Sequence, residues 1–312
     1  MTCRHTFCTL GEGDYHHGVA ALLNSLVENG FVGVFVIGWR GAPPPWLDAL
    51  ESHPDGGWRV GSVRVRLELL DTPWLLAHVK PSFMLDLLDR LEPQSNVVWY
   101  ADPDLVIDVP WSFFERWALQ GIALCEDNCF PKLAPHHYLR RAWTSFAHDH
   151  LGLELDAAMS CGFNSGFVGV SREDRVFLET WQRALEALSA VGVPLDRLKP
   201  GTRLEPFHGT DQDMFNLAAL AHPTCVSSLG PEGMGFSPGM NVMWHAADAP
   251  KPWRRNYFSD LWRYGRGVGT AHRRFWRYAH GPVRSWGVWQ WRCRRLSLSV
   301  AVALSRFYHA IS

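Results

Sequence analysis

Two aspartates, Asp102 and Asp104, stand at the end of an apolar run in the stretch VVWYADPDLVID. In an extended segment, side chains two residues apart point the same way, so these carboxylates can converge on one point. Carboxylates held that close repel each other unless a cation lies between them. Hard oxygen ligands suit Mg²⁺ or Mn²⁺, whose remaining ligands are often substrate phosphates. The alternative is that Asp-Pro-Asp forms only a turn with a helix cap.

Three later stretches carry further residues of the kinds that bind metals and phosphates. CGFNSGFVGVS places Asn164 in a turn of small residues before a strand. HGTDQDMFNLAAL places Asp211 and Gln212 at the start of a helix, and NVMWHAADAPKPWRR adds His245 and Lys251. Three of these residues also have a purely structural interpretation, with Asp211 as a helix cap, Asn164 as a turn residue and His245 as a half-buried histidine.

The rest of the chain alternates between strand and helix patterns. We expect strands at TFCTL, FVGVFVI, SVRVRLELL, NVVWY and GIALCE. We expect helices from His17 to Asn29, in PSFMLDLLDRL starting at Pro81, and in WSFFERWAL with Asp108 and Pro110 in its first turn. This alternation predicts an α/β fold with a mostly parallel central sheet flanked by helices. In such folds, ligands bind at the carboxyl ends of the strands.

The order of four motifs resembles a known family. YADPD, NSGF, DQDMFN and a histidine six residues before the lysine of KPW resemble the retaining, family 8 type nucleotide-sugar glycosyltransferases of the glycosyltransferase A fold. The resemblance runs from Thr6 to about Arg255 and implies a single Rossmann-like catalytic domain of this fold in residues 1–255. It also implies Mn²⁺ or Mg²⁺ as cofactor and a nucleotide-diphosphate sugar, UDP-linked, as donor. A hexose would pass to a glycan or lipid-linked acceptor with retention of anomeric configuration.

The resemblance implies a role for each residue that matches a site position of the family. The metal ligands match Asp102, Asp104 and His245. The lysine that contacts the donor diphosphate matches Lys251. The nucleoside-binding positions match Thr9, Asp14 and Tyr15. Lys80 matches a further basic residue of the family that reaches the donor. The residues near the transferred sugar match Asn164, Asp211 and Gln212.

The chemistry of these residue types fits the same roles. Cleaving a nucleotide sugar leaves new negative charge on the diphosphate, which a divalent ion and Lys251 would stabilise. Gln212 carries an amide that does not titrate, so we expect it to support an oxocarbenium-like sugar rather than to act as a base. One position departs from the family, because Asp248 stands where a glycine usually lets the backbone approach a phosphate.

Two other functions stay open at this point. A sugar nucleotidyltransferase on a similar sheet also uses paired aspartates on a metal. That enzyme class predicts a basic, glycine-rich phosphate loop after the first strand, and GEGDYHHG contains no lysine or arginine. The second alternative is a catalytically degenerate, membrane-associated interaction protein, for which Asp248 is the only indication.

The composition bounds the class of protein. The 312 residues are 47% apolar, enough for one large core or two smaller ones. Seven scattered cysteines make an odd number and no dense framework, which fits a reducing cytosolic compartment. The opening MTCRHTFCTLGEGDYHHG lacks the apolar core of a signal peptide, and no run of about 18 apolar residues predicts a spanning helix. We therefore expect a cytoplasmic protein.

The last part of the chain differs in charge from the rest. From Lys251 to Ser312 there are thirteen lysines and arginines and one acid, Asp260, whereas the first 250 residues hold 17 basic and 30 acidic residues. Apolar residues near the end fall mostly three and four apart beside arginines, namely Trp286, Trp289, Cys293, Leu296, Val300, Ala303, Leu304 and Phe307. We therefore expect a basic, aromatic tail, residues 256–312, with an amphipathic helix.

The tail allows several partners. Arginines and tryptophans on an amphipathic helix suit an anionic cytoplasmic membrane surface, so we expect a protein attached peripherally to the inner face of that membrane. The alternatives are that the tail packs on the catalytic domain or forms an oligomer contact. Nucleic-acid binding is less favoured, because no recognised nucleic-acid-binding module accompanies the tail.

Overall fold

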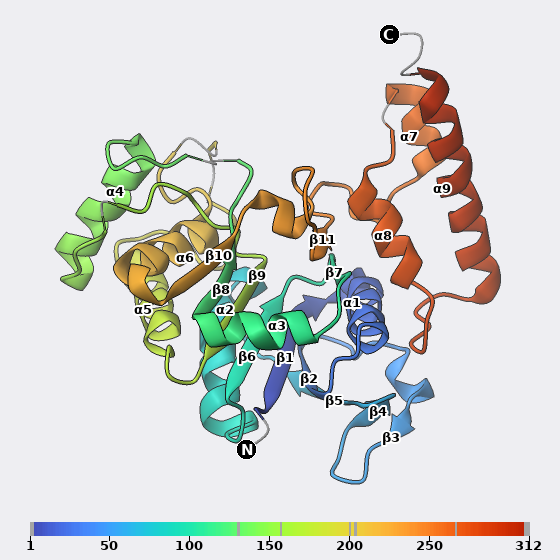
Figure 1. Ribbon diagram of the computed structural model, residues 1–312, viewed down its shortest axis with the longest axis horizontal. Helices are drawn as coiled ribbons and strands as arrows, with labels where there is room; N and C mark the ends of the chain where they lie inside the picture. Colours follow the sequence, from blue (N-terminus) through green and yellow to red (C-terminus); the bar gives the residue numbers. More distant parts are fainter. Residues whose placement is uncertain are drawn as a thin grey trace.

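The structure is a computed structural model that describes residues 3–129, 132–156, 158–199, 201–202, 205–265 and 267–308. Its centre is a mixed sheet of nine strands with helices on both faces (Figure 1). The strand order is β10-β8-β9-β6-β1-β2-β5-β4-β3. The α/β class predicted from the sequence is thereby confirmed.

The middle of the sheet is parallel and its flanks are mixed. The nine strands are β1 (His5–Glu12), β2 (Gly33–Arg40), β3 (Glu51–Ser52), β4 (Trp58–Val60), β5 (Val63–Leu69), β6 (Val97–Ala101), β8 (Ile122–Cys125), β9 (Phe167–Ser171) and β10 (Val226–Leu229). Strands β6, β1, β2 and β5 run parallel, as predicted. Strand β9 runs antiparallel to both β6 and β8, and β3 and β4 form an antiparallel edge.

The helices cover both faces of the sheet because its strands are apolar on both faces. The helices before the tail are α1 (His16–Glu28), α2 (Leu76–Asp86), α3 (Ser112–Trp117), α4 (Tyr138–Phe146), α5 (Val176–Ala190) and α6 (Thr210–Ala221). In β6, Val97 and Trp99 join the core beneath α1 and α3, whereas Val98 and Tyr100 join the core beneath α2, α5 and α6. The strand that ends at the two aspartates is therefore held from both sides.

The predicted start of a helix at Pro81 is wrong. Helix α2 begins at Leu76, and Pro81 lies inside it rather than at its first turn. Because proline has no N–H group, the carbonyl of Ala77 receives no helical hydrogen bond from position 81. Phe83 and Met84 are buried in the core, and burial of this face outweighs the lost bond. The same helical path continues as a π-helical turn, η3 (Leu87–Leu91).

A second, two-stranded sheet lies between the main sheet and the tail. Strand β7 (Leu105–Ile107) pairs antiparallel with β11 (Met243–His245), so that Leu105 lies opposite His245. Each strand has only three residues, too few for a periodic pattern that the sequence could reveal. This pair brings together two segments that are far apart along the chain.

The tail folds as helices α7 (Tyr257–Tyr264), α8 (Thr270–Tyr278) and α9 (Val288–Tyr308). Helix α8 packs against α1, and α9 packs against α7 on the outer side of α8 (Figure 1). The tail shares a hydrophobic core with Ala21 of α1 and Val106 of β7. In addition, Trp286 stacks on His17 with ring centroids 3.8 Å apart. One side of the tail therefore packs on the first 255 residues, which was one of the alternatives predicted for it.

Asp108 connects the tail to β7, and its predicted place in a helical first turn is wrong. Helix α3 begins only at Ser112. The carboxylate of Asp108 instead accepts hydrogen bonds from Trp244 Nε1 at 2.9 Å and from Tyr278 Oη at 2.8 Å, and it pairs with Arg274 at 3.0 Å. These partners are more than 130 residues away in the sequence, so a prediction from local helix signals could not identify them.

Two further observations concern the described residues as a whole. The seven cysteines form no disulfide bond with one another. None of the described helices is both long enough and apolar enough to cross a membrane.

Candidate active site

A cavity of about 420 Å³ opens at the carboxyl ends of β1 and β6. Its lining comes from the end of β1, the start of α2, the segment after β6, and the segment after β11. Among the residues predicted for the site, those that line it are Tyr15, Lys80, Asp102, Asp104, His245 and Lys251. The position agrees with the rule that α/β sheets bind ligands at the carboxyl ends of their strands.

The three predicted metal ligands meet at this cavity. Asp102, Asp104 and His245 each offer one ligand atom, and these atoms lie within 4.8 Å of one another. His245 Nε2 is 3.2 Å from Asp104 Oδ1 and 3.8 Å from Asp102 Oδ2. Among the described residues, this is the one group of three or more such side chains that could hold a metal ion. Two carboxylates and an imidazole are donors that fit Mn²⁺ or Mg²⁺.

The backbone explains why these three side chains converge. Asp102 directly follows β6, and its carbonyl accepts a hydrogen bond from Leu105 N that closes the turn around Pro103. Strand β7 then pairs with β11, and Ala246 N donates to Asp104 O at 3.0 Å. His245 is thereby fixed beside Asp104.

Gly18 allows the turn at Pro103 to pack closely against helix α1. A Cβ atom at position 18 would lie 2.2 Å from the carbonyl oxygen of Pro103 and 2.9 Å from the ring of Trp253. Since no real side chain tolerates such distances, only glycine fits here without a shift of the turn. The same contact holds Trp253, which follows Lys251 by two residues, close to the two aspartates.

Lys251 contacts Asp104, whereas Lys80 of helix α2 contacts Asp102. Lys251 Nζ donates to Asp104 Oδ2 at 2.5 Å and to the carbonyl of Ala247 at 2.9 Å. Burial by itself lowers the pKa of Lys251, but the negative charge of Asp104 outweighs burial and raises it. Burial likewise raises the pKa of Asp104, yet His245 and Lys251 together hold it below the usual value. Asp104 and Lys251 therefore stabilise each other's charged forms.

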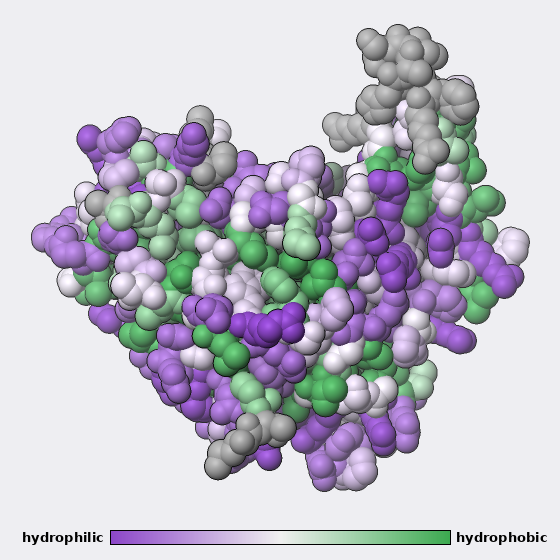
Figure 2. All heavy atoms as spheres, in the orientation of Figure 1, coloured by the Kyte–Doolittle hydropathy of each residue, from purple (hydrophilic) through white to green (hydrophobic). Residues whose placement is uncertain are grey.

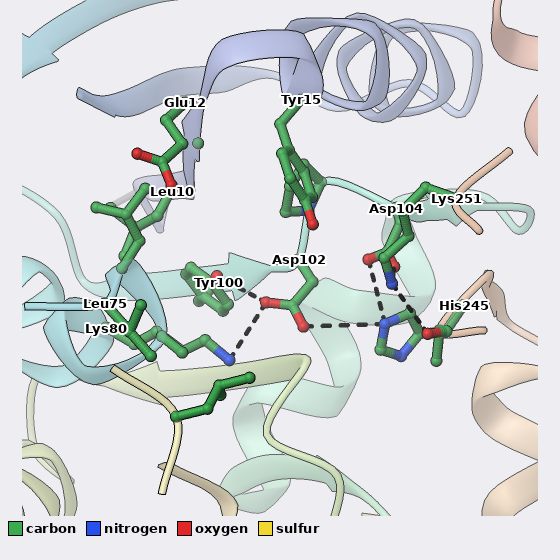
Figure 3. A pocket seen from close by; sticks show the side chains of 16 residues that line it. Leu10, Glu12, Tyr15, Leu75, Lys80, Tyr100, Asp102, Asp104, His245 and Lys251 are labelled. Atoms are coloured by element: carbon green, nitrogen blue, oxygen red, sulfur yellow. Dashed lines mark hydrogen bonds and ion pairs between the residues drawn. The ribbon is translucent and has the colours of Figure 1, made fainter. Parts of the chain in front are cut away.

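Lys80 links the metal ligands to the predicted catalytic residues. Its buried Nζ lies 3.2 Å from Asp102 Oδ1 and 2.9 Å from Asp211 Oδ2 (Figure 3 shows Asp102 between Lys80 and His245). Burial opposes the charge on Lys80, but Asp102 and Asp211 more than compensate, and the pKa of Lys80 is raised. Lys80 thus fixes two carboxylates at once rather than pointing freely at a ligand.

Asp211 has one oxygen engaged and one without a partner. Its Oδ2 accepts hydrogen bonds from Lys80 and from Ser165 Oγ, the latter at 2.7 Å. Its Oδ1 is buried and has no hydrogen-bond partner among the residues that the structure describes. A buried carboxylate oxygen without a donor is costly. Asp211 lies behind Lys80 and does not itself line the cavity.

Asn164 and Gln212 meet at a residue that the sequence analysis missed. Asp127, which is buried, accepts a hydrogen bond from Asn164 Nδ2 at 3.1 Å and one from Gln212 Nε2 at 3.2 Å. Asp127 comes two residues after the end of the buried strand β8, with Glu126 between, so a pair of acids just beyond a buried strand was the signal that could have revealed it. Asp127 orients both amides.

Gly166 shows how closely Asn164 approaches the metal ligands. A Cβ atom at position 166 would lie 2.5 Å from His245 Cε1, 2.7 Å from Asn164 Oδ1 and 3.0 Å from Asp102 Oδ2. The four residues therefore surround one small space. The structure thus brings Asn164 next to two of the predicted metal ligands, Asp102 and His245.

Two of the residues predicted to bind the nucleoside have other partners. Thr9 is buried, and its hydroxyl donates to the carbonyl of Ala101, which ties β1 to β6. Asp14 pairs with Arg254 and, like Thr9, does not line the cavity. Tyr15 does line it, with its ring packed against Trp253 at a centroid distance of 5.1 Å.

Asp248, the departure from the family pattern, has an exposed side chain that does not line the cavity. Its neighbours Ala247 and Lys251 do line it. The acid therefore stands outside the lining through which a phosphate would be bound.

A scan against models of known protein families finds no match for this chain, and a search of curated proteins finds none either. The function is therefore inferred from the motifs and from the geometry of the cavity and its charged residues.

Proposed function

We propose that the protein is a metal-dependent glycosyltransferase of the glycosyltransferase A fold. It transfers a hexose from a nucleotide-diphosphate sugar, UDP-linked, to a glycan or lipid-linked acceptor with retention of anomeric configuration. The observation that carries this proposal is the convergence of Asp102, Asp104 and His245, with Lys251 on the same carboxylate, at the edge of a cavity of about 420 Å³. Cavities that hold small-molecule ligands typically measure about 300–1,000 Å³. The sugar class and the stereochemistry rest on the resemblance of the four motifs.

Asp102, Asp104 and His245 would hold Mn²⁺ or Mg²⁺, which supplies positive charge for the donor diphosphate. Lys251 would add a second positive charge on the same side, since its Nζ lies at the cavity wall. As the bond between the anomeric carbon and the phosphate oxygen breaks, negative charge grows on the diphosphate. A fixed ammonium group stabilises that charge more in the transition state than in the ground state.

The other half of the site would hold the sugar. Asp211 Oδ1 has no donor among the described residues, and a sugar hydroxyl that reached past Lys80 would supply one. Gln212 and Asn164 are oriented by Asp127 and carry amides that do not titrate. They are suited to support an oxocarbenium-like sugar by hydrogen bonds. With retention, the acceptor hydroxyl attacks from the face that the diphosphate leaves, and the departing phosphate oxygen takes its proton.

Hydrolysis of the donor tests the proposal without knowledge of the acceptor. The protein is incubated with a panel of UDP-hexoses and Mn²⁺, and release of UDP is measured. We expect slow UDP release from at least one donor, lost on chelation of the metal and reduced at least about 100-fold in Asp104→Asn. Asp55→Asn, a change to an exposed carboxylate outside the cavity, is the matched control and should leave the rate unchanged.

Two outcomes would contradict the proposal. One is absence of Mn²⁺-dependent UDP release from every donor in the panel. The other is formation of a nucleotide sugar from a nucleoside triphosphate and a sugar phosphate with release of pyrophosphate, which would identify a nucleotidyltransferase.

A further inference from the structure

Helix α9 exposes the apolar stripe that the sequence pattern predicted. The stripe consists of Trp289, Cys293, Leu296, Val300 and Leu304, all of which are exposed. Trp289 is 75% exposed and Leu296 is 66% exposed. The spacings of four, three, four and four residues place these side chains on one face of the helix. Phe307, which belongs to the same pattern, has a side chain outside the described part of the structure.

The opposite face of α9 already has its partners. Leu298 and Ala301 are buried in the core that α9 shares with α7, α8 and α1. The helix therefore packs on the protein by its smaller apolar face and leaves the larger one in solvent. The protein as described offers no cover for this stripe, and large exposed apolar stripes mark interaction sites.

The neighbouring helix α7 adds exposed aromatic residues. It packs against α9, and it exposes Phe258 and Trp262. Figure 2 shows hydrophobic residues interspersed with hydrophilic ones along the outer edge of α9. Tryptophan is the residue most suited to the boundary between a bilayer's headgroups and its acyl chains.

The charge around the stripe is positive. Arg292 and Arg295 are exposed on α9, and neither has an ion-pair partner among the described residues. The one acid of the tail, Asp260, pairs with Arg255 at 2.7 Å. Arg295 lies over the ring of Trp291, which leaves its charge without an acidic partner in the described part of the chain. A surface with such arginines beside exposed tryptophan and leucine favours a partner that is anionic and apolar at once.

We propose that the α9 stripe docks on an anionic phospholipid surface, with α9 lying parallel to the membrane plane. From Trp289 to Leu304 the stripe runs for roughly 22 Å at the helical rise per residue. Apolar side chains would enter the acyl boundary while the arginines contact lipid phosphates. A second copy of the chain fits less well, because its stripe would bring arginines against arginines. The proposal stands independently of the reaction at the cavity.

Vesicle sedimentation with the full chain tests the proposal. Vesicles of phosphatidylcholine alone are compared with vesicles that also contain phosphatidylglycerol. We expect the protein to sediment with the anionic vesicles at low salt and to be released as salt rises. Trp289→Ser with Leu296→Ser should weaken this binding at least about tenfold, and so should Arg292→Glu with Arg295→Glu.

Matched controls separate the stripe from general surface effects. Leu119→Ser removes a similarly exposed leucine elsewhere, and Arg183→Glu reverses an exposed arginine on α5. Both should bind vesicles as the wild type does, and all variants should melt at the wild-type temperature because the changed side chains are exposed. Equal binding by stripe variants and controls would overturn the proposal. A lack of vesicle binding by the wild type would also overturn the proposal. If the wild type instead self-associated and the stripe variants did not, the stripe would be a contact between copies of the chain.

Discussion

The ammonium group of Lys251 lies 2.5 Å from Asp104 Oδ2, although 147 residues separate the two in the chain. A metal ion at Asp104 would therefore meet a cation that already neutralises part of the carboxylate's charge. A diphosphate bound to that metal would instead gain from the same cation. Lys251 should thus oppose binding of the metal alone and favour binding of the metal with the nucleotide.

Replacing Lys251 with alanine should shift these two affinities in opposite directions. The affinity for Mn²⁺ alone should rise roughly 3- to 10-fold, because a competing positive charge is gone. The affinity for UDP in the presence of Mn²⁺ should fall about tenfold, because a charge-assisted hydrogen bond to the diphosphate is lost. Titration calorimetry measures both, with Lys132→Ala, an exposed lysine outside the cavity, as the control. A change of both affinities in the same direction would contradict the role given to Lys251.

Lys80 should be the most costly lysine to neutralise. Lys80→Met leaves Asp102 and Asp211 without their shared buried cation, and breaking a buried pair costs about 3–5 kcal/mol of stability. Adding Asp211→Asn to the same chain should restore part of the loss, since one of the uncompensated carboxylates is then removed. Denaturant unfolding measures the effect. Arg90→Met, which breaks an exposed ion pair, is the control and should change stability much less. Equal losses for both single variants would contradict the network.

Gly166→Ala should impair metal binding more than it impairs folding. The new methyl group would meet three flexible side chains, those of His245, Asn164 and Asp102, and displace the donors from their common point. We expect the Mn²⁺ affinity to fall about tenfold or more. Gly269→Ala is the matched control, since a Cβ there meets nothing within 4 Å. Indistinguishable Mn²⁺ affinities for the two variants would show that the donors do not meet at Gly166.

Asp213 should contribute more to stability at low pH than at neutral pH. Burial in α6 raises the pKa of its carboxyl group to about 7, above the value in the unfolded chain. The folded state therefore binds this proton more tightly, and the resulting stability is present below about pH 4 and lost as the pH rises to about 7. Asp213→Asn should stabilise the protein at pH 8 by on the order of 2 kcal/mol relative to pH 4. A stability difference between variant and wild type that is the same at both pH values would contradict this.

The sequence predicted the parts of the site that lie at strand ends. Asp102 and Asp104 follow a buried run, and this local signal located the cavity correctly. His245 and Lys251 were assigned by resemblance alone, because β7 and β11 are too short for any periodicity to show that they pair. Asp127 carried a related signal, two residues beyond the end of the buried strand β8, and was overlooked.

Long-range contacts account for what the sequence did not predict. Asp108 was expected at a helix start, yet its partners lie on β11 and in the tail. The helical spacing from Trp289 to Leu304 predicted an amphipathic helix but not which face would be buried. The buried face carries Leu298 and Ala301. These two residues give a weaker apolar pattern in the sequence than the exposed stripe on the opposite face.

Binding of UDP with and without Mn²⁺ tests the central claim most directly, because it needs neither the sugar nor the acceptor. Asp102, Asp104 and His245 are claimed to hold the metal that binds the donor diphosphate. In titration calorimetry, Mn²⁺ should therefore increase the affinity for UDP at least about tenfold in the wild type. In Asp104→Asn this increase should disappear. UDP binding that does not depend on Mn²⁺, or that keeps its full dependence in Asp104→Asn, would contradict the claim.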